Sequence, residues 1–269
     1  MLSFCALAPG TRNMKAARMD KSFLCMFSIL WRKVTNFARS MILLADFGNT
    51  RVKAAVLENG RLRHVDDMMK VDVDGGMWCS VHPLDSKVTE WMTAHGMKQL
   101  TAATPIPLSN AYSTPQSLGM DRLAAAVGAW SMKPGHDLLV VDAGTAITYD
   151  FVSADGTYKG GNIAPGIELR FKSLHEHTGA LPLVQADGDA PLFGTDTETA
   201  IRSGVVNGVR KELEGYVNEL CSIYPSLLVF LTGGDAEFFD IKAKSTTFAV
   251  PDLVLRGLAR ITEFNEKGI

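Results

Sequence analysis

The segment LLADFG, residues 43–48, ends a hydrophobic run in Asp-x-Gly, and Asn59-Gly60 follows after ten intervening residues. The segment LVVDAG, residues 139–144, repeats this plan, and Asp155-Gly156 follows after the same interval. Asn-Gly and Asp-Gly are strong hairpin signals because type I′ turns require positive φ at both central residues. Each copy therefore predicts a buried strand, a tight polar turn, a second strand and a hairpin. Two acidic glycine turns facing each other across a cleft suit the phosphates and metal of a nucleotide, so the duplication indicates a phosphotransferase.

The composition is that of a globular protein with enough apolar residues for a sizeable core. The chain has 269 residues, 46% of them hydrophobic, and this length favours two domains of ordinary size over one large domain. The formal net charge of −2 and the lack of interleaved basic and aromatic residues argue against a nucleic-acid partner.

The cysteines indicate reduced thiols inside the cell. There are four, without any Cys-x-x-Cys pair: Cys5, Cys25, Cys79 and Cys221. A disulfide framework or a zinc site would space them differently, so we expect a cytoplasmic protein. Cys79 with His82, and the pair His175 and His177, are the only fragments of a metal site. Neither has a second half nearby, so we interpret them as surface or core residues.

Residues 1–40 differ from the rest of the chain. Their apolar stretch, residues 23–31, is too short to span a bilayer, which takes about 20 residues. Basic residues precede it as in a signal peptide, but Arg32-Lys33 closes it and no cleavage site follows. We interpret Met41 as the natural start and expect no membrane partner; a membrane-associating extension is the alternative.

Strand and helix signals alternate from Met41 onward, which predicts an α/β architecture with two similar lobes. Lys133-Pro134-Gly135 marks the expected boundary, giving an extension (1–40), an N-terminal lobe (41–136) and a C-terminal lobe (137–269). The proline-rich loop 104–115 is expected to be irregular and functional. The expected strands are residues 42–46, 52–57, 61–65, 100–103, 138–142, 146–151, 157–160 and 227–231, and the expected helices are 85–95, 122–132, 168–175, 198–220 and 252–264, with a glycine-rich connection at 160–166.

The first turn, residues 46–53, carries groups that suit a nucleotide. Gly48 lets the backbone turn sharply towards a ligand, and Asn49 and Thr50 can donate to phosphate oxygens. Asp46 can hold Mg2+ directly or through water, and Lys53 can reach the same phosphates. Alone this is a weak signal, since an ordinary strand–turn–strand explains it; its partial repetition at residues 142–145 strengthens it.

A third turn, residues 232–235 (TGGD), follows a buried strand. Its glycine pair allows a flat group, such as an adenine or a ribose, to approach the main chain. Taken alone, a plain strand-to-helix turn explains this segment better.

Residues 119–122 (GMDR) place a carboxylate at a helix N-terminus, where the helix dipole keeps it ionised. Asp121 is either an N-cap or a catalytic group, and Arg122 beside it offers a bidentate fork for a carboxylate or phosphate. This pair suits a small acidic acceptor with a hydroxyl group. The loop that contains Tyr112 lies immediately upstream and can close over such an acceptor.

Taken together, these motifs resemble type III pantothenate kinases. The resemblance runs from Met41 to nearly the C-terminus, and no matched motif position is broken. Residues 1–40 have no counterpart in it. It is carried by the following segments, in order: 46–50 (DFGNT), Tyr112 through 119–122 (GMDR), 142–150 (DAGTAITYD), 160–166 (GGNIAPG) and 232–235 (TGGD).

The resemblance implies the duplicated actin-like ATPase fold of the acetate and sugar kinases, with ATP in the interlobe cleft. It implies phosphorylation of pantothenate to 4'-phosphopantothenate, the first step of coenzyme A biosynthesis. It also implies Mg2+, a monovalent cation (K+ or NH4+) held by Asp142, and a homodimer in which Thr197 reaches the partner's pocket. The implied roles are catalytic base for Asp121, ATP binding for Asp46, Phe47, Gly48, Asn49, Thr50, Arg51, Val52, Lys53 and Thr145, and pantothenate binding for Tyr112, Gly119, Met120, Asp121, Arg122 and Thr197.

Two alternatives stay open. One is another small-molecule kinase or phosphatase on the same fold, because the residues themselves indicate only a small anionic acceptor with a hydroxyl group. The other is a non-catalytic nucleotide-binding regulator or filament subunit, which would keep the nucleotide turns without needing Asp121.

Overall fold

A computed structural model describes residues 41–236 and 245–267. The interpretation of Met41 as a natural start, and the alternative of a membrane-associating extension, concern residues 1–40 and lie outside this range. Within the range that is described, no helix combines the length and the apolar character needed to cross a membrane.

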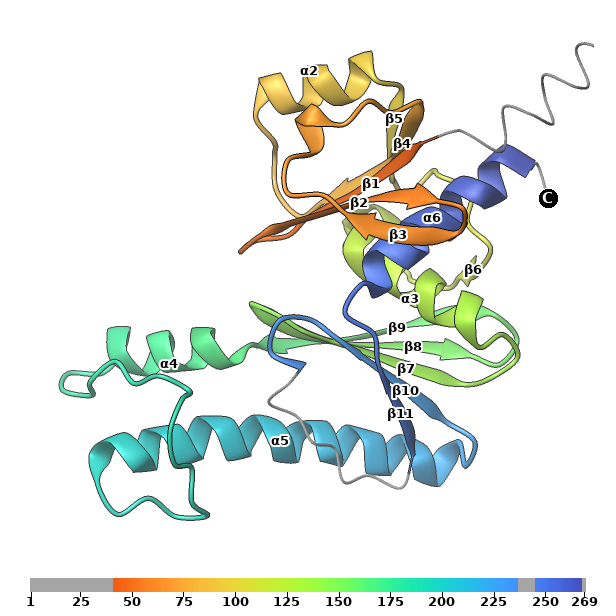
Figure 1. Ribbon diagram of the computed structural model, residues 1–269. Helices are drawn as coiled ribbons and strands as arrows, with labels where there is room; N and C mark the ends of the chain where they lie inside the picture. Colours follow the sequence, from red (N-terminus) through yellow and green to blue (C-terminus); the bar gives the residue numbers. More distant parts are fainter. Residues whose placement is uncertain (1–40, 237–244, 268–269) are drawn as a thin grey trace, which may run out of the picture. The chain divides into compact units, whose positions relative to one another are not determined.

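Two mixed sheets form the framework of the structure (Figure 1). The first contains β1 (Ile42–Phe47), β2 (Val52–Glu58), β3 (Arg61–His64), β4 (Gly75–Ser80) and β5 (Met97–Gln99). The second contains β6 (Ser109–Asn110), β7 (Leu138–Ala143), β8 (Ala146–Ser153), β9 (Thr157–Pro165), β10 (Leu228–Thr232) and β11 (Thr246–Ala249). Their orders are β3-β2-β1-β4-β5 and β11-β10-β7-β8-β9-β6.

The strand order repeats between the sheets. Strands β1 to β3 are antiparallel neighbours, and so are β7 to β9. The next two strands are parallel in both cases, β4 and β5 beyond β1, and β10 and β11 beyond β7. The duplication predicted from the two Asp-x-Gly segments is therefore confirmed, and it gives the two-lobe actin-like architecture.

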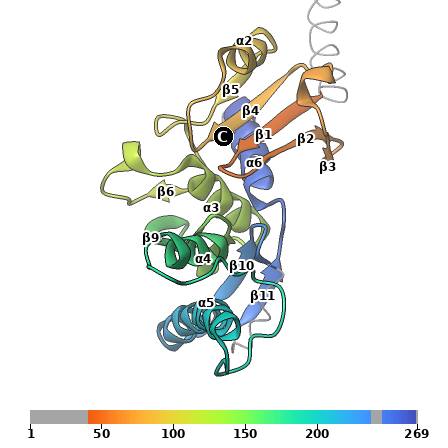
Figure 2. The same ribbon diagram turned by 90° about the vertical axis from the view of Figure 1, so that its left-hand side faces the viewer.

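Five α-helices are described: α2 (Ser86–Ala94), α3 (Met120–Met132), α4 (Ile167–Glu176), α5 (Thr197–Ile223) and α6 (Leu253–Lys267). Helices α3 and α6 lie between the two sheets, while α2 covers the far face of the first sheet and α4 and α5 that of the second (Figures 1 and 2). The central apolar cluster accordingly joins Leu44 and Met77 of the first sheet to Val140 and Phe230 of the second through the alanine-rich α3.

Helices α3 and α6 are in backbone contact. A Cβ atom on Gly257 would overlap the carbonyl oxygen of Ala124, and one on Gly128 would overlap that of Leu253. Both positions therefore require glycine, and these contacts hold α3 and α6 close together.

Several elements differ from the prediction. Strand β4 was not predicted; it begins with Gly75 and Gly76, and Gly76 is needed because a Cβ there would overlap the Leu43 carbonyl. Strand β11 was also missed. The strand expected at 100–103 is instead β5, Met97–Gln99, and the loop 104–115 contains the short strand β6. The predicted connection at 160–166 is largely strand, because β9 continues to Pro165 alongside β8.

The proposed division after residue 136 stays a prediction. Two elements cross it, since β6 pairs with β9 of the second sheet and α6 packs against β1, β2 and β4 of the first. The lobes are thus defined by their sheets more than by a single cut in the chain.

Candidate active site

A cavity of about 350 Å³ lies where the two Asp-x-Gly turns, the N-terminus of α3 and the turn after β10 meet. It brings together residues from segments far apart in the sequence. The predicted site residues that line it are Asp46, Gly48, Asn49, Thr50, Arg51, Lys53, Asp121, Asp142 and Thr145. The other lining residues, which were not among the predicted site residues, are Val81, Gly144, Ala146, Thr148, Glu168, Gly233, Gly234 and Asp235.

The two turns touch. The hydroxyl groups of Thr50 and Thr145 are hydrogen-bonded at 2.8 Å. Lys53 Nζ donates to the carbonyl oxygen of Pro251 at 2.9 Å, just before α6 begins. Because Lys53 lies opposite Asp46 in the β1–β2 register, this bond ties the first turn to the segment that leads into α6.

The turn after β10 folds back on the end of β7. Gly233 has a φ of 97°, and a Cβ there would overlap the backbone of Ala143. The amide of Asp235 donates to the carbonyl oxygen of Ala143 at 2.9 Å. Gly233, Gly234 and Asp235 thereby line the edge of the cavity, and the subsite for a flat group stays a prediction.

Four carboxyl groups that line the cavity have a raised pKa; one of them is Asp235, whose pKa is raised chiefly by burial. Burial raises the pKa of Asp46 to about 6, and the charge of Asp121 adds to the increase. Burial raises the pKa of Asp142 to about 7, again with a contribution from Asp121. Burial also raises the pKa of Asp121 itself. The cavity therefore concentrates negative charge that a bound cation would stabilise.

The donors suit hard cations. Asp46, Asp121 and Asp142 all present carboxylate oxygens, which Mg2+ prefers. Within residues 41–236 and 245–267, however, no cluster of three or more His, Cys, Asp or Glu side chains has the arrangement of a complete metal site. Mg2+ commonly takes only one or two protein carboxylates and completes its shell with water and substrate phosphates. The arrangement fits such a shared ion.

Asp121 lies in the first turn of α3. Its Oδ1 accepts a hydrogen bond from the amide of Arg122 at 2.9 Å, and a Cβ on Gly119 would come within 2.5 Å of the same oxygen. Glycine at position 119 thus leaves room for the carboxylate of Asp121, which lines the cavity from the end of the helix.

Arg122 does not extend freely into the cavity. Its Nη2 donates to Asp150 Oδ1 at 2.6 Å, and its Nε lies 3.1 and 3.2 Å from the two carboxylate oxygens. Both residues are buried. The bidentate fork predicted for an external anion is therefore occupied from inside the protein, and a contact between Arg122 and the acceptor stays a prediction.

Other predicted residues lie outside the cavity lining. Phe47 is buried and packs edge-on against Trp78, whereas Val52 is exposed at the start of β2. Met120 packs against the central apolar cluster, and Tyr112 lies beside Tyr158. Thr197 is exposed at the first position of α5.

Two polar groups near the turns were not among the predicted site residues. The Cys79 thiol donates to Asp46 Oδ1 at 3.6 Å, because β4 lies parallel to β1 with Cys79 beside Asp46. Thr148 Oγ1 is buried without a hydrogen-bond partner among the described residues, and Thr148 faces Asp142 in the β7–β8 register. Only knowledge of the strand pairing could have shown either neighbour.

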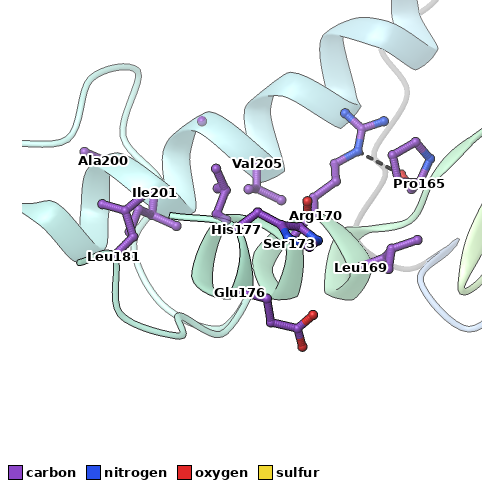
Figure 3. A pocket seen from close by; sticks show the side chains of 12 residues that line it. Pro165, Leu169, Arg170, Ser173, Glu176, His177, Leu181, Ala200, Ile201 and Val205 are labelled. Atoms are coloured by element: carbon purple, nitrogen blue, oxygen red, sulfur yellow. Dashed lines mark hydrogen bonds between the residues drawn. The ribbon is translucent and has the colours of Figure 1, made fainter. Parts of the chain in front are cut away.

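A larger cavity, about 790 Å³, lies between α4 and α5 (Figure 3). Its lining is mainly apolar and includes Leu169, Ile201 and Val205. It lacks the facing carboxylates and glycine turns of the smaller cavity, so the smaller one is the candidate active site.

The comparisons with known proteins agree with this geometry. The family model described as type III pantothenate kinase matches residues 60–219. A type III pantothenate kinase of Phocaeicola vulgatus is 48% identical over 241 residues, covering 84% of this chain and 100% of the relative. This chain belongs to the type III pantothenate kinase family. A second member, from Bacteroides fragilis, is 44% identical over 247 residues, and the match covers 84% of this chain and 98% of the relative.

Among solved structures, a Campylobacter jejuni protein described as a Baf family transcriptional activator aligns with a TM-score of 0.55 at 25% identity. The alignment covers 84% of this chain and 100% of that protein. The fold of this family member is therefore shared with a protein whose description is regulatory.

Proposed function

We propose that this chain transfers the γ-phosphoryl group of ATP to the primary hydroxyl of pantothenate, giving 4'-phosphopantothenate for coenzyme A biosynthesis. Family membership supports the substrate and the donor. The observation that carries the chemistry is that Asp121 lies in one cavity with both acidic glycine turns. A carboxylate that can accept the hydroxyl proton therefore lies next to the groups that would hold the triphosphate.

Asp121 acts as the general base. It orients the pantothenate hydroxyl and accepts its proton as the oxygen attacks the γ-phosphorus, while the bond from the γ-phosphorus to the β,γ-bridging oxygen of ATP breaks and ADP leaves. The raised pKa brings Asp121 closer to neutral pH than an exposed aspartate, which strengthens it as a base.

The two turns hold the phosphates. Amides and hydroxyls at residues 46–53 bind phosphate oxygens from one lobe, and Thr145 does so from the other. Because Thr50 and Thr145 are hydrogen-bonded to each other at 2.8 Å, ATP binding exchanges this contact for contacts with the phosphates.

Cations complete the site. Asp46 would hold Mg2+ and Asp142 a monovalent cation, K+ or NH4+, and these ions would supply positive charge opposite the transferring phosphoryl group. The raised pKa values of these two carboxyl groups support this assignment, because bound cations offset the cost of burying their charges together.

The acceptor lies on the α3 side, at Tyr112, Gly119, Met120 and Arg122. The Tyr112 ring lies 5.9 Å from the Arg122 guanidinium, which supports a common surface for both residues. The cytoplasm is the proposed location, because ATP is available there and Cys79 and Cys221 are both free thiols.

We also propose a homodimer formed by α4, α5 and the segment between them. Phe193 in that segment is 82% exposed, and residues of α4 and α5 line the cavity shown in Figure 3. Gly204 and Gly208 lie one turn apart on α5 with open space where a Cβ would stand, which suits close approach of a second helix. Thr197 at the start of α5 would then reach the partner's site. Light scattering that gives the mass of one chain would refute this proposal.

An acceptor panel with purified full-length chain tests the function. ADP release is measured with pantothenate, a sugar, acetate and no acceptor, each with and without K+. Release that depends on pantothenate and K+ supports the proposal. Release with another acceptor favours a different kinase of this fold, and no release with any acceptor favours a regulator of the kind that the Campylobacter jejuni description suggests.

A further inference from the structure

Asp150 is a buried carboxylate that the proposed chemistry does not use. It lies on β8 with 1% of its surface exposed and does not line the candidate active site. Three groups nevertheless bind it: Nε and Nη2 of Arg122, and the hydroxyl of Tyr158 on β9, which donates to Oδ1 at 2.6 Å. A buried ion pair of this kind is weak evidence for stability, since desolvation offsets much of its attraction.

The pairing fixes the orientation of the guanidinium. Because Asp150 engages the edge formed by Nε and Nη2, rotation of the group about its long axis is prevented. The Tyr112 ring lies 5.9 Å from the guanidinium carbon and limits it on a second side. Nη1 lies outside the pairing with Asp150, so the donors of that edge have a defined direction.

Arg122 also connects Asp150 to Asp121, the proposed catalytic base. The amide of Arg122 donates to Asp121 Oδ1 at 2.9 Å, while its side chain is held by Asp150. Arg122 therefore has one end at the candidate base and the other in the buried network. A small shift of its side chain changes how an acceptor carboxylate would lie relative to Asp121.

We propose that Asp150 and Tyr158 are positioning residues for acceptor specificity: they hold the Arg122 guanidinium so that its outer donors bind the carboxylate of the acceptor. This inference rests on the proposed function, in which the acceptor is pantothenate. Neither residue touches the acceptor. Their effect is on the preference for an acid over a neutral molecule of the same shape.

The test compares pantothenate with pantothenol, in which a hydroxymethyl group replaces the carboxylate. The ratio of the two kcat/KM values is measured at saturating ATP for the wild type, Asp150→Asn and Tyr158→Phe. Charged hydrogen bonds are the stronger class, so we expect the ratio to fall about tenfold or more in Asp150→Asn and about threefold in Tyr158→Phe. The KM for pantothenate should rise in both variants, while the KM for ATP stays unchanged.

Tyr149→Phe is the matched control. Tyr149 is also buried and also donates to a carboxylate, Glu212 Oε1 at 3.0 Å, but it lies on the opposite face of β8. Its removal should leave the ratio at the wild-type value. Tyr158→Phe keeps the ring in place, so it provides a test even if Asp150→Asn fails to fold.

Two results would overturn the inference while leaving the proposed function intact. One is an unchanged ratio in Tyr158→Phe and in folded Asp150→Asn, and the other is a wild type that uses both acceptors equally well. A wild type that phosphorylates neither acceptor refutes the proposed function itself, and the inference with it.

Discussion

Replacing Asp121 with Asn substitutes an NH2 group for one carboxylate oxygen in the first turn of α3. The Oδ1 atom remains and can still accept the Arg122 amide hydrogen bond, so the helix start should be kept. The lost property is the ability to take a proton. A general base contributes about 10²–10⁴ in rate, which corresponds to roughly 3–5 kcal/mol of transition-state stabilisation.

The structure also predicts the effect of this substitution on stability. The raised pKa of Asp121 means that its ionised form is disfavoured in the folded protein, chiefly by burial. The Asp121→Asn variant lacks this buried charge, so it should be as stable as the wild type or slightly more stable. We expect a melting temperature within about 4 °C of the wild-type value or above it, which for a chain of this size is about 1 kcal/mol or less.

The assay is ADP release with saturating ATP and pantothenate, alongside thermal unfolding by circular dichroism. Asp137→Asn is the matched control, because its Oδ1 also accepts one backbone hydrogen bond, from Ala154 at 2.9 Å, but lies outside the cavity. The control should retain the wild-type rate. If Asp121→Asn phosphorylates pantothenate at the wild-type rate, or loses activity only because it unfolds, the assignment of the base is wrong.

Three further results are expected. Gly257→Ala places a methyl group against the Ala124 carbonyl, so it should lower the free energy of unfolding by about 1–3 kcal/mol. This is measured by denaturant titration, and an unchanged unfolding midpoint would contradict the close contact of α3 and α6. Burial raises the pKa of Asp46 from 3.8 to about 6 in the folded protein. In protein without nucleotide or metal, protonated Asp46 therefore contributes stability that is fully present below pH 3.8 and is lost as the pH rises through about 6. This trend, measured by thermal unfolding, should be weaker in Asp46→Asn. Omitting K+ should slow wild-type ADP release, whereas Asp142→Asn should be slow with or without K+; strong activation of this variant by K+ would refute Asp142 as the cation ligand.

The main outline of the fold could be predicted from local sequence. The two Asp-x-Gly segments and their hairpins are short-range signals, and they determine β1, β2, β7 and β8 in the structure. The buried face of α5 could also be predicted from the sequence, because Ile201 and Val209 are separated by a helical spacing, and both are buried in the structure. Strand β4 was missed because Gly75 and Gly76 lower strand propensity, and the reason for Gly76 is contact with β1, far away in the chain.

The site was predictable in its composition but less so in its contacts. Aspartates and glycines of the turns were found because each turn is a continuous segment. The ion pair between Arg122 and Asp150 was not predicted, because the two residues are 28 positions apart. The sequence around Asp150 does not distinguish a buried, paired carboxylate from an exposed one. The thiol of Cys79 beside Asp46 depends in the same way on the parallel pairing of β1 with β4.

The position of α6 has a consequence for how the protein is made. Ribosomes release β1 to β5 first, yet one face of that sheet packs on a helix that begins only at Leu253. Until the residues of α6 have been synthesised, this face can be covered by α3 or by chaperones. Ligand-binding competence should therefore arise only after α6 has been synthesised, and nascent chains stalled before residue 253 should be bound by chaperones.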